Sequence, residues 1–186
     1  MKKILLFLLT ISLLSLPMSA CTEDKDADSQ TVEASEEKSV VLNLTAEANN
    51  ILEKYNLSGG ILYSSESNTP GEYLDEDAIR GYYGDAVTMP DFSCVESYVV
   101  YIDESKPILP CEFGIFKISD QEKAEAFLVY LQARINKKIQ NSIAYPSVDT
   151  SMLKNAIYEI RNGYLWYIAV KDANTAISDT LKSKLN

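Results

Sequence analysis

Apolar residues recur every three or four positions over several stretches of the chain, a spacing that predicts amphipathic helices. The clearest helix begins at the capping-box sequence Ser119-Asp120-Gln121-Glu122 and continues over about five turns. Its apolar stripe, which we expect to face the core, consists of Ala124, Phe127, Leu128, Leu131, Ile135 and Ile139. Similar spacings predict a helix capped by Thr45, a short helix over 75–83 and a final helix capped by Asp172.

Other stretches are dense in β-branched and aromatic residues and predict strands. Residues 95–102 and 112–118 form two such stretches, and the first is apolar on both faces. Two more stretches flank Asn162-Gly163, a strong signal for a two-residue hairpin turn. That turn places Tyr158 opposite Tyr167. The order of elements predicts an α+β fold, in which a mainly antiparallel four-stranded sheet has helices packed on one face.

The first residues read as a secretion signal. Lys2 and Lys3 precede an apolar run over 4–16, which is too short to span a hydrocarbon core of about 30 Å. Met18-Ser19-Ala20-Cys21 then resembles the lipobox of bacterial lipoproteins, which implies a diacylglyceryl group on Cys21 and cleavage before it. The alternative is an ordinary secretory signal with a cysteine near the cut.

These features predict the domain organisation. Residues 1–20 are the lipoprotein signal peptide, and 21–42 are a flexible tether with several acidic residues and no aromatic one. Residues 43–186 form a single α+β domain. We therefore expect a protein that is lipid-anchored through Cys21 on the extracytoplasmic face of the cell membrane.

Charge and composition narrow the function. The net charge is −10, and removal of 1–20 takes away two of the 17 basic residues and none of the 27 acidic ones, which leaves −12. A surface this negative disfavours nucleic acid. The chain has no histidine, which excludes serine–histidine and cysteine–histidine nucleophilic sites and imidazole zinc sites. We expect no cofactor, no metal and no enzymatic activity.

Cys94 and Cys111 allow two readings. A disulfide is compatible with an extracytoplasmic location. If 95–103 and 111–118 pair as a hairpin, however, Cys111 lies opposite about Asp103 and Cys94 opposite about Asp120. Each residue of strand adds about 3.3 Å, so the sulfurs would be far beyond bridging range. The disulfide and the hairpin exclude each other.

Two groups of side chains suggest sites. The carboxylates Asp75, Glu76, Asp77 and Asp85 are close in sequence, and they serve either acid–base chemistry or helix capping.

The second group lies on one face of the C-terminal hairpin and comprises Glu159, Arg161, Tyr164 and Trp166. Aromatic residues beside a charge pair form a candidate binding face for a peptide or a glycan. Alternatively, the C-terminal helix covers Trp166.

Several short motifs after residue 111 resemble a family of uncharacterised Gram-positive lipoproteins, defined only as a domain of unknown function. The motifs are Glu112-Phe113-Gly114-Ile115-Phe116-Lys117, Asp120, Arg134, Gln140, Tyr145-Pro146, Leu153, Asn155-Ala156 and Gly163-Tyr164. The resemblance implies a cell-surface lipoprotein and carries no reaction or ligand with it.

Three functions follow. The first, which we favour, is a membrane-anchored lipoprotein with a non-catalytic domain that binds an envelope protein, a peptide or a glycan. The second is a receptor lipoprotein associated with a transporter. The third is a carboxylate-dependent hydrolase, for which the sequence supplies no nucleophile paired with a base.

Overall fold

The structure is a computed structural model that describes residues 41–85, 87–105 and 111–186. The described residues all belong to one compact unit. The predicted signal peptide, Cys21 and almost all of the predicted tether lie outside the described residues.

One antiparallel sheet of five strands forms the middle layer, in the order β1-β2-β3-β5-β4. The strands are β1 (Ile61–Ser64), β2 (Val95–Ile102), β3 (Glu112–Ile118), β4 (Ile157–Arg161) and β5 (Tyr164–Ala169). The predicted α+β class is confirmed, but the four-stranded count is wrong because β1 was not foreseen. β1 has only four residues, which is too short for a period of two to show.

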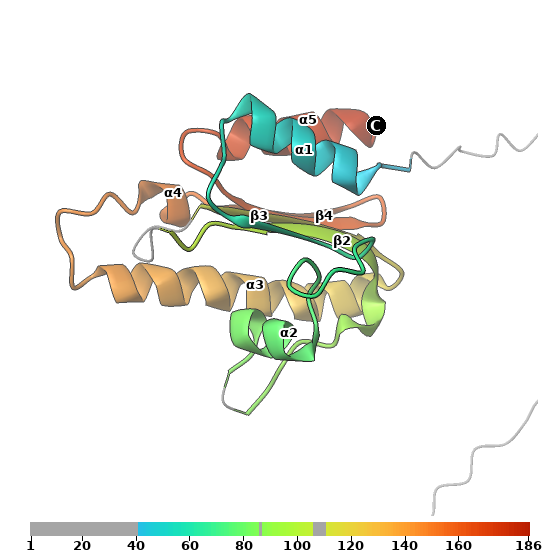
Figure 1. Cartoon of the computed structure of the whole chain (residues 1–186), viewed down its shortest axis with the longest axis horizontal. Coiled ribbons are helices and arrows are strands. Elements are labelled where there is room, and N and C mark those ends of the chain that lie inside the picture. The colour runs from blue at the N-terminus through green and yellow to red at the C-terminus, as the bar shows by residue number, and fades with distance from the viewer. Residues whose placement is uncertain (1–40, 86, 106–110) are drawn as a thin grey trace, which may run out of the picture. The chain divides into compact units, whose positions relative to one another are not determined.

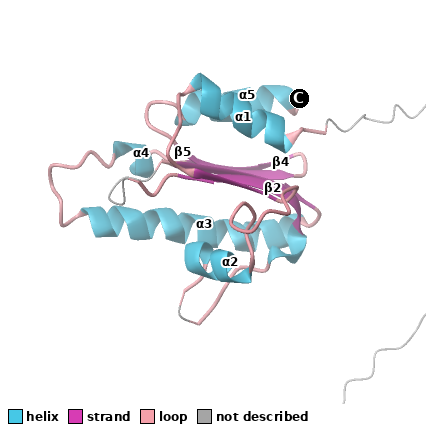
Figure 2. Cartoon of the chain, in the orientation of Figure 1, coloured by secondary structure: helices cyan, strands magenta, loops and turns pink. Residues whose placement is uncertain are grey.

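Helices cover both faces of this sheet, so the prediction that they pack on one face is wrong (Figure 1). One face carries α1 (Leu44–Lys54) and α5 (Asn174–Lys184), and the other carries α2 (Glu76–Tyr83) and α3 (Gln121–Ser142). The short helices η1 (Phe92–Cys94) and α4 (Ser151–Lys154) complete the described set (Figure 2). The physical reason is that β5 is buried at every position, and a sheet that is apolar on both sides needs a cover on both.

Each face of the sheet therefore has its own core. The predicted stripe of α3 packs against Phe116, Leu165 and Tyr167 on the α2–α3 side. On the other side, α1 and α5 pack against Phe113, Ile115 and Trp166.

The helix starts differ in detail from the prediction. The side chain of Asn43, not Thr45, caps α1 by accepting a hydrogen bond from the amide of Ala46. Asp75 caps α2 and Asp120 caps α3 in the same way. The predicted cap Asp172 instead adopts a φ of 57°, and α5 starts two residues later. The apolar pattern thus located the helices, whereas their first residues depend on which polar side chain reaches a free amide.

Both predicted hairpins are present. Tyr158 lies opposite Tyr167, and the positive φ values of Asn162 and Gly163 are those of a tight two-residue turn. In the β2–β3 hairpin the amide of Asp103 donates to the carbonyl of Cys111 over 2.9 Å. At the far end the amide of Ser119 donates to the carbonyl of Cys94 over 2.9 Å. The two cysteines lie at opposite ends of the hairpin, so no disulfide joins them.

Candidate functional site

The predicted binding face on the C-terminal hairpin is not an exposed platform. Trp166 has no exposed surface, and its indole Nε1 donates to Oγ of Ser178 on α5 over 3.2 Å. Tyr164 is 2% exposed, and its hydroxyl accepts a hydrogen bond from the amide of Leu42 over 2.9 Å. Both aromatic residues belong to the core beneath α1 and α5, because helices cover this face of the sheet.

The two charged residues of that predicted face lie on the edge strand β4. The register pairs Glu159 with Trp166 and Arg161 with Tyr164. Glu159 makes an ion pair with Lys182 of α5 at 2.8 Å. The four residues are thus neighbours, but only the charged pair reaches solvent.

The carboxylates near α2 are engaged locally. Asp75 caps the helix, and Glu76 pairs with Arg80 one turn later at 3.0 Å. The side chain of Asp85 accepts the amides of Val87 and Thr88, and these hydrogen bonds hold the pKa of Asp85 below its usual range. The contacts of Asp75, Glu76 and Asp85 thus support a helix end, a helical turn and a loop turn.

A buried ion pair joins the sheet to α3 and forms the centre of the candidate site. Glu112, at the start of β3, has no exposed surface, and Arg134 is 9% exposed. Arg134 Nε donates to one carboxylate oxygen of Glu112 at 2.9 Å, and Nη2 donates to the other at 2.7 Å. The geometry is bidentate, which is the strongest form of this contact. Burial is the largest single influence on the pKa of Arg134 and lowers it, but the charge and hydrogen bonds of Glu112, together with Tyr167 and Tyr83, outweigh burial and raise that pKa overall.

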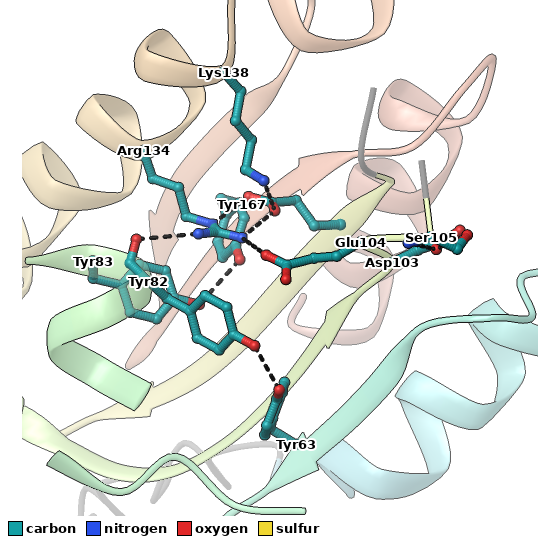
Figure 3. A network of polar contacts seen from close by, with 10 residues as sticks. Tyr63, Tyr82, Tyr83, Asp103, Glu104, Ser105, Arg134, Lys138 and Tyr167 are labelled. Carbon is teal, nitrogen blue, oxygen red and sulfur yellow. Dashed lines mark hydrogen bonds and ion pairs between the residues drawn. The ribbon is translucent and has the colours of Figure 1, made fainter. Parts of the chain in front are cut away.

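The end of α2 encloses Arg134 from the other side (Figure 3). Nη1 of Arg134 donates to the carbonyl of Tyr82 over 3.2 Å. The guanidinium carbon lies 4.9 Å from the ring centre of Tyr82 and 5.7 Å from that of Tyr83, which are cation–π distances. Nη2 also lies 3.9 Å from a carboxylate oxygen of Glu104. All three nitrogens of the guanidinium therefore have partners.

Two hydroxyl contacts fix the position of α2. The hydroxyls of Tyr63 on β1 and Tyr82 lie 2.6 Å apart, and those of Tyr83 and Tyr167 lie 3.1 Å apart. Burial raises the pKa of Tyr83 and of Tyr167, so both hydroxyls stay neutral. Tyr167 lies directly opposite Gly114, where an added Cβ would come within 2.5 Å of the ring.

Lys138 completes the charged cluster. Its side chain is 15% exposed, and its Nζ lies 3.5 Å from a carboxylate oxygen of Glu112. Burial lowers the pKa of Lys138, although the charges of Glu112 and Glu104 oppose the shift. Glu112 thus faces two cations, and Arg134 makes the shorter contact.

A cleft of about 250 Å³ opens beside this cluster, between α3 and the end of α2. One wall is a face of α3 whose residues follow each other at three- and four-residue spacing: Tyr130, Ala133, Arg134, Lys137, Lys138 and Asn141. The opposite wall is formed by residues 81–85 at the end of α2 and just beyond it. The cleft therefore has three cationic side chains on its α3 wall and two glycines, two tyrosines and one aspartate on the other.

Gly81 is an unusual residue for this wall. It lies inside α2, where glycine costs about 1 kcal/mol relative to alanine. A Cβ added at Gly81 would meet no atom within 4 Å, so packing does not require a glycine. Gly81 lines the cleft, so a larger side chain at this position would stand at the edge of the cleft.

The sequence prediction missed this site, although signals for it exist. Arg134 immediately precedes Ile135 and falls beside the apolar stripe of α3, and Glu112 opens an otherwise apolar strand. A charged residue within a buried pattern indicates a charged partner. The sequence does not indicate which partner, because the two residues belong to different elements.

The described residues hold no group of three or more acidic, cysteine or histidine side chains arranged to bind a metal ion. Over the same part of the chain, no helix combines the length and the hydropathy needed to cross a membrane. Comparisons with protein-family models, with curated proteins and with solved structures find no match.

Proposed function

We propose that the chain is a lipid-anchored extracytoplasmic protein whose domain binds a small ligand, or the end group of an envelope peptide or glycan, in the α2–α3 cleft. Binding takes place without chemical conversion. Cys21 provides the anchor, and the acidic segment that follows it provides the tether. The proposal joins the lipobox-like sequence at the N-terminus to the cleft of the folded domain.

The observation that carries the binding role is Gly81. An interior helical glycine with no packing constraint lowers stability and contributes nothing to the core. It lies on the wall of the cleft opposite α3, the helix that carries Arg134 and Lys138. A site of this kind, concave and supplied with a few polar groups, is typical of small-ligand recognition.

The state of the nearby carboxylates supports binding rather than catalysis. Both oxygens of Glu112 accept hydrogen bonds from Arg134. Asp85 accepts hydrogen bonds from its own turn. Neither carboxylate is placed to act as a general base on a bound molecule.

Thermal unfolding with and without candidate ligands tests the cleft. The purified chain and its Gly81→Leu variant are screened against small organic acids, amino acids, sugars and organic amines. A compound present at about 100 times its Kd stabilises the folded state by about 2.7 kcal/mol, which is roughly 5–10 °C for a domain of this size. We expect such a shift in the parent protein and its loss in Gly81→Leu.

The matched control is Ala176→Leu, which places the same side chain on the exposed surface of α5, across the sheet from the cleft. This variant should respond to ligand as the parent does. If Gly81→Leu and the parent respond alike to every compound, the cleft is not the binding site and the proposal fails.

The anchor is tested separately. Intact-mass analysis of protein extracted from membranes should show the added mass of a diacylglyceryl group, and Cys21→Ala should lose both that mass and membrane retention. Equal mass increments or equal retention in the two proteins would refute lipidation.

A further inference from the structure

We infer that the group recognised in the α2–α3 cleft is a compact oxyanion, either a carboxylate or a phosphate. This inference rests on the proposed function and adds the chemical class of the ligand. It follows from the charges that face the cleft and from the size of the cleft.

The cleft is lined by three cations and one carboxylate, Arg134, Lys137 and Lys138 against Asp85. This balance contrasts with a chain whose net charge is −10. The carboxylate of Asp85 is occupied by hydrogen bonds from Val87 and Thr88. Among the residues that line the cleft, cations therefore outnumber carboxylates three to one.

The carboxylates of the buried cluster lie outside the lining. Glu112 is fully buried behind Arg134 and Lys138, and both of its oxygens are hydrogen-bonded. Glu104 is 56% exposed and lies 3.9 Å from Arg134, so solvent screens its charge. Glu112 and Glu104 thus contact the cations from positions outside the cleft lining. An anion could approach the same cations from within the cleft.

Lys138 is the residue best placed to bind that anion. Its ammonium group has three hydrogens, and its ion pair among the described residues is the 3.5 Å contact with Glu112. A mostly buried ammonium group with one long contact gains more from a second anionic partner than an exposed one does. Lys137 and Asn141, which are one turn apart along the same wall, add further donors.

The size of the cleft limits the ligand. The cleft has a volume of about 250 Å³, at or below the small end of the usual range for ligand pockets. A carboxylate or phosphate with a few attached atoms fits this space. A larger ligand must reach beyond the cleft and insert only its anionic end.

The protonation state of Lys138 determines how the affinity for an anion should change with pH. The groups that face its Nζ are Glu112, Glu104 and Arg134, and burial is the main reason that its pKa lies below the ordinary 10.5. A bound anion favours the charged form, so affinity is greatest while Lys138 is protonated. Affinity should therefore fall as the pH rises through the lowered pKa of Lys138.

Calorimetric titration of the purified chain tests the inference with stated probes. The probes are succinate, glutamate and inorganic phosphate as oxyanions, glucose as a neutral compound and ethanolamine as a cation. We expect binding of at least one oxyanion, with affinity reduced roughly tenfold to a hundredfold in Lys138→Met. Lys138→Arg should retain most of the affinity because it keeps the charge.

Lys123→Met is the matched control, since Lys123 lies on the same helix but pairs with Asp91 at 3.3 Å outside the cleft lining. It should leave affinity unchanged. Gly81→Leu adds a side chain at the cleft wall without removing charge and should weaken binding even if Lys138→Met folds poorly.

The outcomes separate the two proposals. Binding of glucose or ethanolamine, blocked by Gly81→Leu, would overturn the oxyanion inference and leave the binding site in place. An oxyanion whose affinity is unchanged by both Lys138→Met and Gly81→Leu binds elsewhere and overturns the inference. Absence of binding by every oxyanion probe overturns the inference as well, and a thermal-shift panel insensitive to Gly81→Leu overturns the proposed function.

Discussion

Glu112→Gln removes one negative charge from the buried cluster at the start of β3 and leaves the shape of the side chain nearly unchanged. Arg134 would keep its contacts with the carbonyl of Tyr82 and with the tyrosine rings. The amide oxygen of Gln could accept only one of the two hydrogen bonds, at 2.9 and 2.7 Å, and its NH2 group would face a guanidinium donor in place of the other oxygen. Lys138 would lose its ion pair with Glu112. Two mostly buried cations would then face each other without a buried anion.

The expected loss of stability is about 3–5 kcal/mol, the range for breaking a buried ion pair by removing one partner. That range applies here because Glu112 has no exposed surface and Arg134 is 9% exposed. The free energy of unfolding of a typical domain is about 5–15 kcal/mol, so the substitution removes a large fraction of that stability. The midpoint of thermal unfolding should fall by roughly 10 °C.

Urea unfolding, followed by circular dichroism and by the fluorescence of Trp166, measures this loss. Glu96→Gln provides the matched control, because Glu96 pairs with Lys117 at the same 2.7 Å but with 45% of its side chain exposed. The control should lose less than about 1 kcal/mol. A double-mutant cycle with Arg134→Met should show that the two losses are not additive, since the double variant leaves one buried cation, Lys138, without its ion pair, whereas Glu112→Gln alone leaves two.

Two results would refute this reasoning. One is a Glu112→Gln variant that loses no more stability than Glu96→Gln. The other is a cycle in which the losses of Glu112→Gln and Arg134→Met simply add. Either result would mean that the cluster is more hydrated than its burial indicates.

Three further predictions concern other parts of the domain. Ser178→Ala should cost about 1–3 kcal/mol in urea unfolding, because it leaves the buried indole N–H of Trp166 without its acceptor. The Cys94 residue is 1% exposed, and burial raises the pKa of its thiol. A thiol reagent near neutral pH should therefore label Cys94 only at the rate of unfolding, and rapid labelling of the folded chain would contradict its burial. Asn162→Ala should lower the midpoint of thermal unfolding for two reasons: alanine is strained at a φ of 48°, and the side-chain amide of Asn162 no longer donates its 2.7 Å hydrogen bond to the carbonyl of Leu185. An unchanged midpoint would contradict this prediction.

Local patterns predicted much of the fold. The bounds of β2 and β3, the buried stripe of α3 and the register around Asn162-Gly163 all follow from residues that are close in sequence. Burial of Trp166 beneath helices was only one of two alternatives at the sequence level. The core around Trp166 includes residues of α1, which lie more than a hundred positions away in the sequence. The hydrogen bond from Leu42 to Tyr164, which spans 122 positions, illustrates that distance.

The site was harder to predict than the fold. Glu112 and Arg134 are recognisable as charges beside buried positions, but their pairing depends on how α3 packs on β3. The cleft depends in addition on where α2 lies, and α2 is held by hydroxyl contacts between tyrosines 19 and 84 positions apart. No local periodicity encodes contacts of this kind.

Gly114, in the central strand β3, is connected to the wall of the α2–α3 cleft through side chains that pack between them. Any larger residue there would push the ring of Tyr167 aside, and the hydroxyl of Tyr167 holds Tyr83. Tyr83 in turn belongs to the wall of the cleft. The displacement caused by one methyl group added in the middle strand would thus pass through two tyrosine rings and reach the wall of the cleft.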